Sequence, residues 1–159
     1  MCIMTSKPAP AVTTVLQAHE CWKQLRTVSV GRLAVWVEDH PDIFPINYTT
    51  DHGTLVFRTG GGTKLASVLG ETPVAMEADG VDSGTGVAWS VVAKGVASAI
   101  LATDDVLDTL GLPLFPWEDG HKDHFIRITP TSITGRSFVV AEPSAWWGPL
   151  DNSPRTATE

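Results

Sequence analysis

The sequence predicts a mainly β protein, built as a six-stranded barrel with a few short helices beside it. Six segments rich in β-branched and aromatic residues occur along the chain, and turns containing Gly, Pro, Asn or Asp separate them. Only three short stretches have helical periodicity. The 159 residues, 43% of them apolar, are enough for one domain with its own core. These observations together favour a single all-β domain.

The strands are expected where β-rich runs are bounded by turn sequences such as Asp-His-Gly. They are Arg32 to Glu38, Ile43 to Thr50, Thr54 to Arg58, Val74 to Glu77, Val87 to Leu101 and His124 to Thr134.

Helices are expected in three places. The first begins with a capping-box pair, Thr14 and Gln17, and runs as far as Arg26. Its apolar face comprises Val15, Ala18, Trp22 and Leu25. A second short helix begins at Thr63 and stops at Gly70, and a third covers Asp104 to Leu110. The first of these helices is expected to pack on the barrel.

The chain is expected to divide into three parts. Residues 1–12 are a loose arm with proline breaks, residues 13–138 are one barrel domain, and residues 139–159 are a tail. Cys2 and Cys21 are the only cysteines, so a disulfide framework is not expected. Cys21, Trp22 and Trp36 are expected to be buried in the core.

The charge balance excludes several classes of partner. The net charge is 11 minus 18, or −7, and no basic tract is present, which argues against a nucleic-acid or anionic membrane surface. No apolar run is long enough for a membrane span, and the N-terminus lacks the apolar core of a signal peptide. We therefore expect a cytoplasmic protein.

A glycine loop between two cations is the strongest local signal for a ligand. Arg58 and Thr59 end an expected strand, three glycines follow at 60–62, and Thr63 and Lys64 open a helix. Unpaired N–H groups at a helix start attract phosphate, and glycines let the backbone approach it. A flexible turn with solvated cations explains the same residues equally well.

Pro45 carries a second signal, because a strand interior normally excludes proline. It stands in the middle of the segment Ile43 to Thr50, which places that segment at a sheet edge or a bulge. An edge strand with an Asn47 amide can donate to and accept from a heteroaromatic ring. A simple barrel corner is the competing interpretation.

The order of these motifs resembles the pyridoxamine 5′-phosphate oxidase-like, flavin-binding split β-barrel family, in the branch that includes nitroimidazole-reductase-like proteins. The resemblance covers residues 15–138. It rests on Gly31-Arg32-Leu33-Ala34, on His40 to Tyr48, on Arg58-Thr59 with Gly62-Thr63-Lys64-Leu65, on Val74 to Gly80, on Gly86 to Gly95, and on Phe115-Pro116-Trp117 through Arg136.

The resemblance implies a split β-barrel homodimer with two FMN sites at the subunit interface, each built from both chains. Asp42, Pro45, Ile46 and Asn47 would follow the flavin ring and ribityl chain. The phosphate would be held by Arg58, Thr59, Thr63 and Lys64. The ring site would be closed by Trp89 and Ser90, or by Trp117 of the partner chain.

The expected function is that of an FMN-dependent oxidoreductase, in which the flavin carries the chemistry and no catalytic side chain is required. A low-charge pocket of Trp36, Tyr48 and Trp89 would suit an uncharged planar substrate such as a quinone or nitroaromatic. Basic residues near the chain end, which pyridoxamine phosphate oxidases use for their substrate, are absent until Arg155. A deazaflavin-dependent reductase and a non-catalytic flavin- or haem-binding dimer remain alternatives, with His121 or His124 as axial haem ligand.

Other chemistries have little support in the sequence. His121 and His124 form the only close histidine pair, and no Cys or Glu completes a metal-ligand set around them. No Gly-x-Ser-x-Gly elbow is present, so a hydrolytic triad is not expected either.

Overall fold

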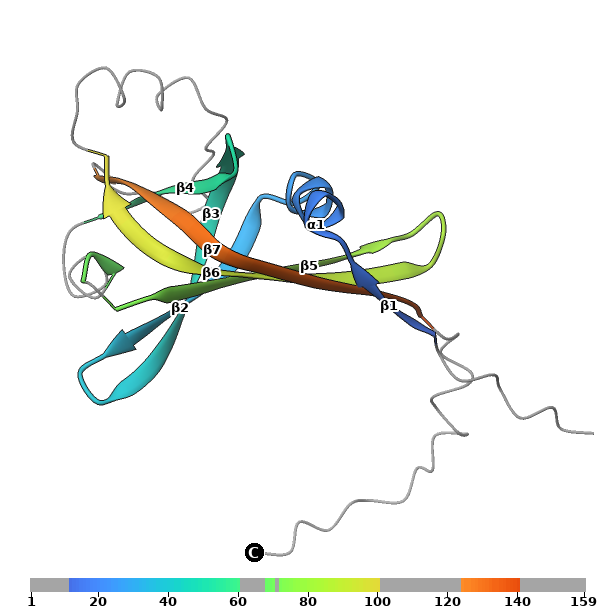
Figure 1. Ribbon diagram of the computed structural model, residues 1–159, viewed down its shortest axis with the longest axis horizontal. Helices are drawn as coiled ribbons and strands as arrows, with labels where there is room; N and C mark the ends of the chain where they lie inside the picture. The colour runs from blue at the N-terminus through green and yellow to red at the C-terminus, as the bar shows by residue number, and fades with distance from the viewer. Residues whose placement is uncertain (1–11, 61–67, 71, 101–123, 141–159) are drawn as a thin grey trace, which may run out of the picture.

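The computed structural model describes residues 12–60, 68–70, 72–100 and 124–140. These residues form seven strands and one helix, drawn in Figure 1. Their bounds are β1 Thr13–Leu16, α1 Ala18–Leu25, β2 Val30–Val37, β3 His40–Asp51, β4 Thr54–Thr59, β5 Val74–Asp82, β6 Val87–Ala99 and β7 His124–Val139. Within these ranges, no helix is long and apolar enough to cross a bilayer.

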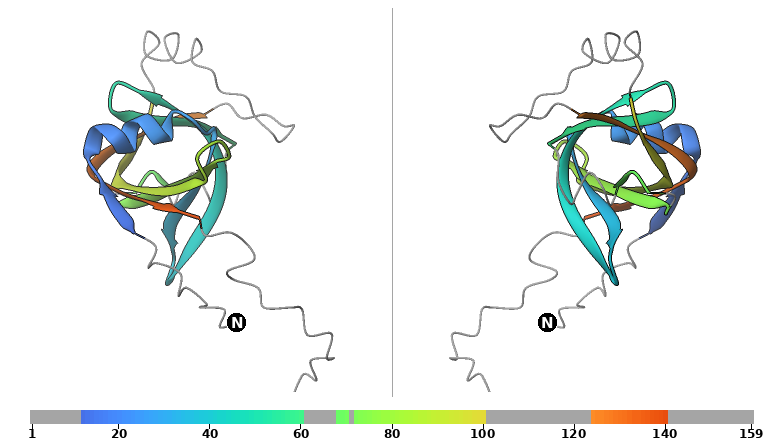
Figure 2. Two further views of the ribbon diagram at one scale, coloured as in Figure 1. Left: turned by 90° about the vertical axis from the view of Figure 1, so that its right-hand side faces the viewer. Right: turned by 90° about the vertical axis from the view of Figure 1, so that its left-hand side faces the viewer.

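Six of the strands close into a ring. All pairs are antiparallel in the order β7-β4-β3-β2-β5-β6, and β6 pairs with β7 to close the circle, as the end-on views of Figure 2 show. The predicted six-stranded barrel is therefore confirmed. The seventh strand, β1, lies outside the ring and pairs with residues 135–138 of β7, beyond the part of the same edge that β4 occupies.

The barrel is split because β7 and β3 each change their pairing partner part-way along their length. One edge of β7 pairs with β4 over residues 124–128 and with β1 over residues 135–138. Strand β3 pairs with β2 over residues 40–47 and with β4 over residues 48–51. The pairing of β6 with β7 contains a bulge at Lys94/Gly95, where the added bend helps the long strands to curve.

The prediction of a helix from Thr14 was wrong at its first turn. Residues 13–16 form β1, because a run of β-branched side chains favours an extended backbone and β7 offers its free edge there. The helix begins at Ala18, after a capping box formed by Gln17 and Glu20, in which the Gln17 N–H donates to the Glu20 carboxylate at 2.6 Å. Val15 is consequently 70% exposed rather than part of a buried helical face.

The core lies inside the ring and under α1. Its fully buried members include Leu25 of α1, Leu33 of β2, Phe57 of β4, Met76 of β5 and Ile126 of β7. Cys21 is fully buried, as predicted. Trp22 packs against the same cluster, but Trp36 is 53% exposed on the outer face of β2, so its predicted burial was wrong. It lies opposite Pro41 near the end of the β2–β3 hairpin, away from the ring's interior.

Other expected boundaries moved outward. Strand β7 continues to Val139, five residues past the predicted end, because its last residues pair with β6 on one side and with β1 on the other. Most of the predicted helix 63–70 and all of the helix 104–110 lie outside the described residues, as do residues 1–11 and 141–159 of the predicted arm and tail.

We predict that Gly135→Ala destabilises the fold by about 1–3 kcal/mol through overpacking. A Cβ at Gly135 would lie 2.7 Å from Cys21 Sγ and 3.1 Å from both Leu16 Cδ1 and Val91 Cγ2. Urea unfolding measures the change. Gly70→Ala is the control, because its nearest neighbour would be 3.8 Å away. Equal stability of the two variants would contradict the close packing of α1 on β7.

Candidate flavin site at the parting of β3 and β4

Strands β3 and β4 part at one end of their short ladder. The last pair at this end joins Tyr48 to Phe57. One residue further on each strand stand Asn47 and Arg58, where β3 continues beside β2 and β4 continues beside β7. In the described residues, the β3 edge from 40 to 47 that faces away from β2 makes no ladder. The expectation of an edge at Pro45 is therefore met by one side of β3.

Asn47 and Arg58 lie on the same, outer face of the sheet. Side chains alternate along a strand, and the inner positions next to them, Ile46, Tyr48, Phe57 and Thr59, are all at most 4% exposed. The outer face therefore receives the amide of Asn47 and the guanidinium of Arg58 from two neighbouring strands. This is the pair of predicted site residues that the structure brings together.

The Asn47 amide is poorly satisfied within the chain. Its Oδ1 atom is buried and has no hydrogen-bond partner among the residues that the structure describes. A buried acceptor without a donor costs about 1–3 kcal/mol. Such a cost is tolerated where a ligand supplies the donor, and an N–H group of a heteroaromatic ring would do so.

The outer face beside Arg58 also carries an aromatic ring. Arg58 is paired with Phe125 across β4 and β7, and its guanidinium carbon lies 5.1 Å from the ring centroid. This cation–π contact orients the guanidinium on the sheet surface. Phe125 and its neighbour Arg127 were missed from the sequence. No local pattern marks them, since only the pairing of residues 124–128 with 55–59 brings them to the site.

Arg127 is engaged by the β3–β4 hairpin. Its guanidinium donates to Asp51 Oδ2 at 2.7 Å and to Thr54 Oγ1 at 2.6 Å. The hydrogen bond from Arg127 is the main reason that the pKa of Asp51 lies below its usual value. This pair fixes the hairpin that presents Arg58. Arg127 therefore has a structural role, while Arg58 stands one residue beyond the last pair of the β3–β4 ladder.

The remaining predicted site residues are more dispersed. Asp42 lies further along β3 and its carboxylate accepts from the Ile43 N–H at 2.9 Å, while Pro45 is exposed opposite Arg32. Thr59 is buried and its hydroxyl donates to the Gly60 carbonyl at 3.2 Å. Ser90 lies on the outer face of β6, opposite Asp79 and Arg136. Thr63, Lys64 and Trp117 fall outside the described residues.

Two predicted site residues point into the barrel instead. Ile46 is 4% exposed and belongs to the core, so only its main chain can meet a ligand at the edge. Trp89 is 5% exposed, and its ring packs so closely on Gly80 that a Cβ there would lie 2.9 Å from the indole. The predicted pocket of Trp36, Tyr48 and Trp89 is not formed, because Trp36 faces outward while Tyr48 and Trp89 face inward.

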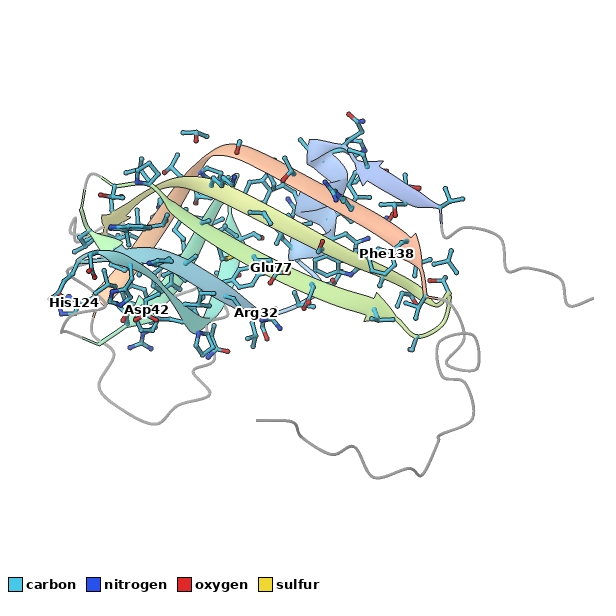
Figure 3. All side chains as sticks on the ribbon, turned by 90° about the horizontal axis from the view of Figure 1, so that it is seen from below. Arg32, Asp42, Glu77, His124 and Phe138 are labelled. Atoms are coloured by element: carbon cyan, nitrogen blue, oxygen red, sulfur yellow. The ribbon has the colours of Figure 1, made fainter. Side chains whose placement is uncertain are left out.

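A charged group occupies the same outer face further along the sheet. Arg32 Nη1 donates to Glu77 Oε2 at 2.9 Å and to Asp79 Oδ1 at 3.2 Å, and these hydrogen bonds raise the pKa of Arg32. Figure 3 shows Arg32 and Glu77 between Asp42 and His124 at one end of the molecule and Phe138 at the other. In the described ranges, no three His, Cys, Asp or Glu side chains gather as metal ligands.

Comparison with known proteins identifies the family. Residues 17–137 match the family model described as pyridoxamine 5′-phosphate oxidase. The chain belongs to this family. The match spans the ring, α1 and the parting of β3 and β4, and it agrees with the resemblance seen in the sequence motifs.

Solved structures agree with this assignment. A candidate pyridoxamine 5′-phosphate oxidase of Corynebacterium glutamicum is 37% identical, with 81% of this chain and 100% of that chain covered at a TM-score of 0.74. An FAD-binding protein of Mycobacterium smegmatis is 38% identical, with 79% and 98% covered at a TM-score of 0.68. A candidate 5-nitroimidazole antibiotic resistance protein of Bacteroides thetaiotaomicron, 13% identical over 82% and 90%, shares the fold at a TM-score of 0.63.

We predict that the stabilisation of the oxidase-family barrel by the Asp51–Arg127 pair is complete above about pH 4 and declines at lower pH. The folded-state pKa of Asp51 is lowered, so its contribution is present above the unfolded pKa of about 3.9 and is lost as the pH falls through the folded value. Asp51→Asn should cost about 1 kcal/mol at pH 7 and less at pH 3. Urea unfolding at both pH values checks this.

Asp39→Asn is the matched control for that experiment, because the Asp39 side chain is 94% exposed and pairs only with the neighbouring His40 among the described residues. A loss for Asp51→Asn that stays the same at pH 3 would show that packing, and not charge, is responsible.

Proposed function

We propose that this protein is a flavin-dependent oxidoreductase of the cytoplasm that uses FMN and works as a homodimer. The observation that carries the proposal is the parting of β3 and β4, where the unpaired Asn47 oxygen and the Arg58 guanidinium stand on one face beside a free strand edge. When bound there, the flavin would supply hydride transfer to a small planar acceptor of the quinone or nitroaromatic type.

The residues of this chain would bind and orient the flavin. Asn47 Oδ1 would accept from an N–H of the ring, and the main chain of β3 from Asp42 to Asn47 would run beside the ring and ribityl chain. Arg58 would contact the phosphate as a bidentate donor, with Thr63 and Lys64 completing the oxygen contacts. Thr59 would contribute through its main chain, because its buried hydroxyl donates to the Gly60 carbonyl. Each of these groups has the donor or acceptor character that its proposed role requires.

A homodimer would complete the site from its open side. The ring would rest on the outer face of one subunit, so a second surface is needed to exclude water from it. The exposed Trp36 and Ile43 on the β2–β3 hairpin, 53% and 64% exposed, are apolar groups that a subunit contact would cover. We propose that the partner chain contributes Trp117 to each site.

We predict that Arg58→Ala weakens FMN binding about tenfold to a hundredfold while leaving riboflavin binding nearly unchanged. Riboflavin lacks the phosphate that Arg58 would hold, and a charge-assisted hydrogen bond contributes about 1.5–3 kcal/mol. Quenching of flavin fluorescence during titration measures both affinities. Lys94→Ala removes an equal charge from the exposed outer face of β6 and should leave both affinities unchanged.

Asn47→Ala makes the complementary test, because Asn47 would contact the ring that FMN and riboflavin share. Both affinities should fall together, by about tenfold. If Arg58→Ala and Lys64→Ala leave FMN binding intact, the phosphate site is assigned wrongly. Tighter binding of FAD than of FMN would keep the flavin site and change the cofactor.

Turnover distinguishes an oxidoreductase from a protein that only stores or senses flavin. We predict that NAD(P)H or a partner reductase bleaches the visible absorption of the bound flavin under anaerobic conditions, and that adding a quinone or nitroaromatic restores it. Bound flavin that no donor reduces would support the non-catalytic alternative, and tight binding of haem or a deazaflavin without FMN would overturn the proposal.

A further inference from the structure

A hollow in the surface of the molecule lies where α1 ends. It has a volume of about 400 Å³ and is lined by residues 25–29, which lead from α1 to β2, and by residues 48–50 of β3. This volume is within the usual range for small-molecule sites, about 300–1,000 Å³. Nothing in the proposed flavin chemistry uses it.

Hydrogen bonds hold the two walls of this cavity together. The Tyr48 hydroxyl donates to the Leu25 carbonyl at 2.7 Å, and the Tyr48 N–H donates to the Ser29 carbonyl at 2.9 Å. Burial raises the pKa of Tyr48, so its hydroxyl keeps its proton and remains a donor at neutral pH. The cavity therefore has a fixed shape before any ligand arrives, which lowers the entropic cost of binding.

The lining offers donors and no carboxylate. Its lining residues with hydrogen-bonding side chains include Arg26, Ser29 and Thr50. Thr50 lies on the same face of β3 as Tyr48, which bonds to Leu25, whereas Thr49 lies on the opposite face. Thr27 is already engaged, since its hydroxyl donates to the Gln24 carbonyl at 2.7 Å. Among the residues that the structure describes, the side chains of Arg26, Ser29 and Thr50 make no hydrogen bond or ion pair with the protein.

A lining without acids is notable in a chain that carries 18 of them. One guanidinium and two hydroxyls can donate to the same group of oxygens, as carboxylates and phosphates require. The apolar wall formed by Leu25 and Val28 would contact the carbon portion of such a molecule. An uncharged or cationic ligand would leave the Arg26 donors unmatched.

We propose that this cavity binds a small organic anion, held through its carboxylate or phosphate by Arg26 and by the hydroxyls of Ser29 and Thr50. The net charge of −7 opposes any anion, so binding depends on this one cation and weakens with added salt. The site shares β3 with the proposed flavin site, and neither proposal rests on the other.

The test is an amide NMR titration of the full chain with succinate and, separately, with inorganic phosphate, before and after saturation with FMN. We expect saturable shifts of the amides of residues 26–29 and 48–50, with a dissociation constant of about 1 mM. Succinate alone, phosphate alone or both producing these shifts identifies the head group. Shifts centred on Arg58 and Gly60 would instead report the flavin phosphate site.

Arg26→Gln should weaken the affinity about tenfold, and Arg26→Lys should restore part of it. The matched control is Lys23→Gln, which removes the same charge from the last turn of α1 outside the lining and should change the affinity less than about twofold. Thr50→Val removes one hydroxyl at constant shape and should weaken binding about threefold to tenfold.

Three results would overturn the proposal. The first is the absence of saturable shifts at residues 26–29 and 48–50 with either anion. The second is wild-type affinity in Arg26→Gln. The third is an equal loss of affinity in Lys23→Gln, which would reduce the effect to the overall charge of the protein.

Discussion

The change of partner along β3 is the constraint on which the rest of the structure depends. The strand leaves β4 and continues beside β2 at the boundary between Asn47 and Tyr48. Tyr48 fixes this point, because its buried hydroxyl bonds to the end of α1 and its N–H bonds to the loop before β2. Leaving a buried carbonyl such as that of Leu25 without its donor costs about 1–3 kcal/mol. One tyrosine thus holds together the helix, the two halves of the split barrel and the free edge of β3.

The candidate flavin site is a product of this divergence rather than of a compact motif. Asn47 and Arg58 are eleven positions apart in the chain, and they become neighbours only because β3 and β4 form a hairpin whose ladder stops one residue before them. The Arg127–Asp51 pair braces the other end of the same hairpin. Arg127 is engaged at that end of the hairpin, and Arg32 is bridged to Glu77 and Asp79, so both of these cations have structural roles.

Strand periodicity and turn chemistry were enough to predict the ring of six strands, and Pro45 was enough to locate a free edge on β3. The sequence failed where long-range pairing overrides local preference. Thr14 and Gln17 fit a capping box, but β7 offered a partner and residues 13–16 became a strand. Trp36 looked like a core residue by its type, and only the register opposite Pro41 places it outside. Phe125 beside Arg58 could not be foreseen for the same reason, since 67 residues separate them in the chain.

Strand β7 is the last of the strands that the structure describes, yet it pairs with β6, β4 and β1. Until it emerges during synthesis, the ring cannot close, and the edges of β4 and β6 stay open to other chains. The barrel is therefore expected to form after translation of its last strand, slowly, as suits a fold whose contacts join distant parts of the sequence. A chain that terminates early at any point before His124 would be an aggregation hazard and a natural substrate for chaperones and proteases.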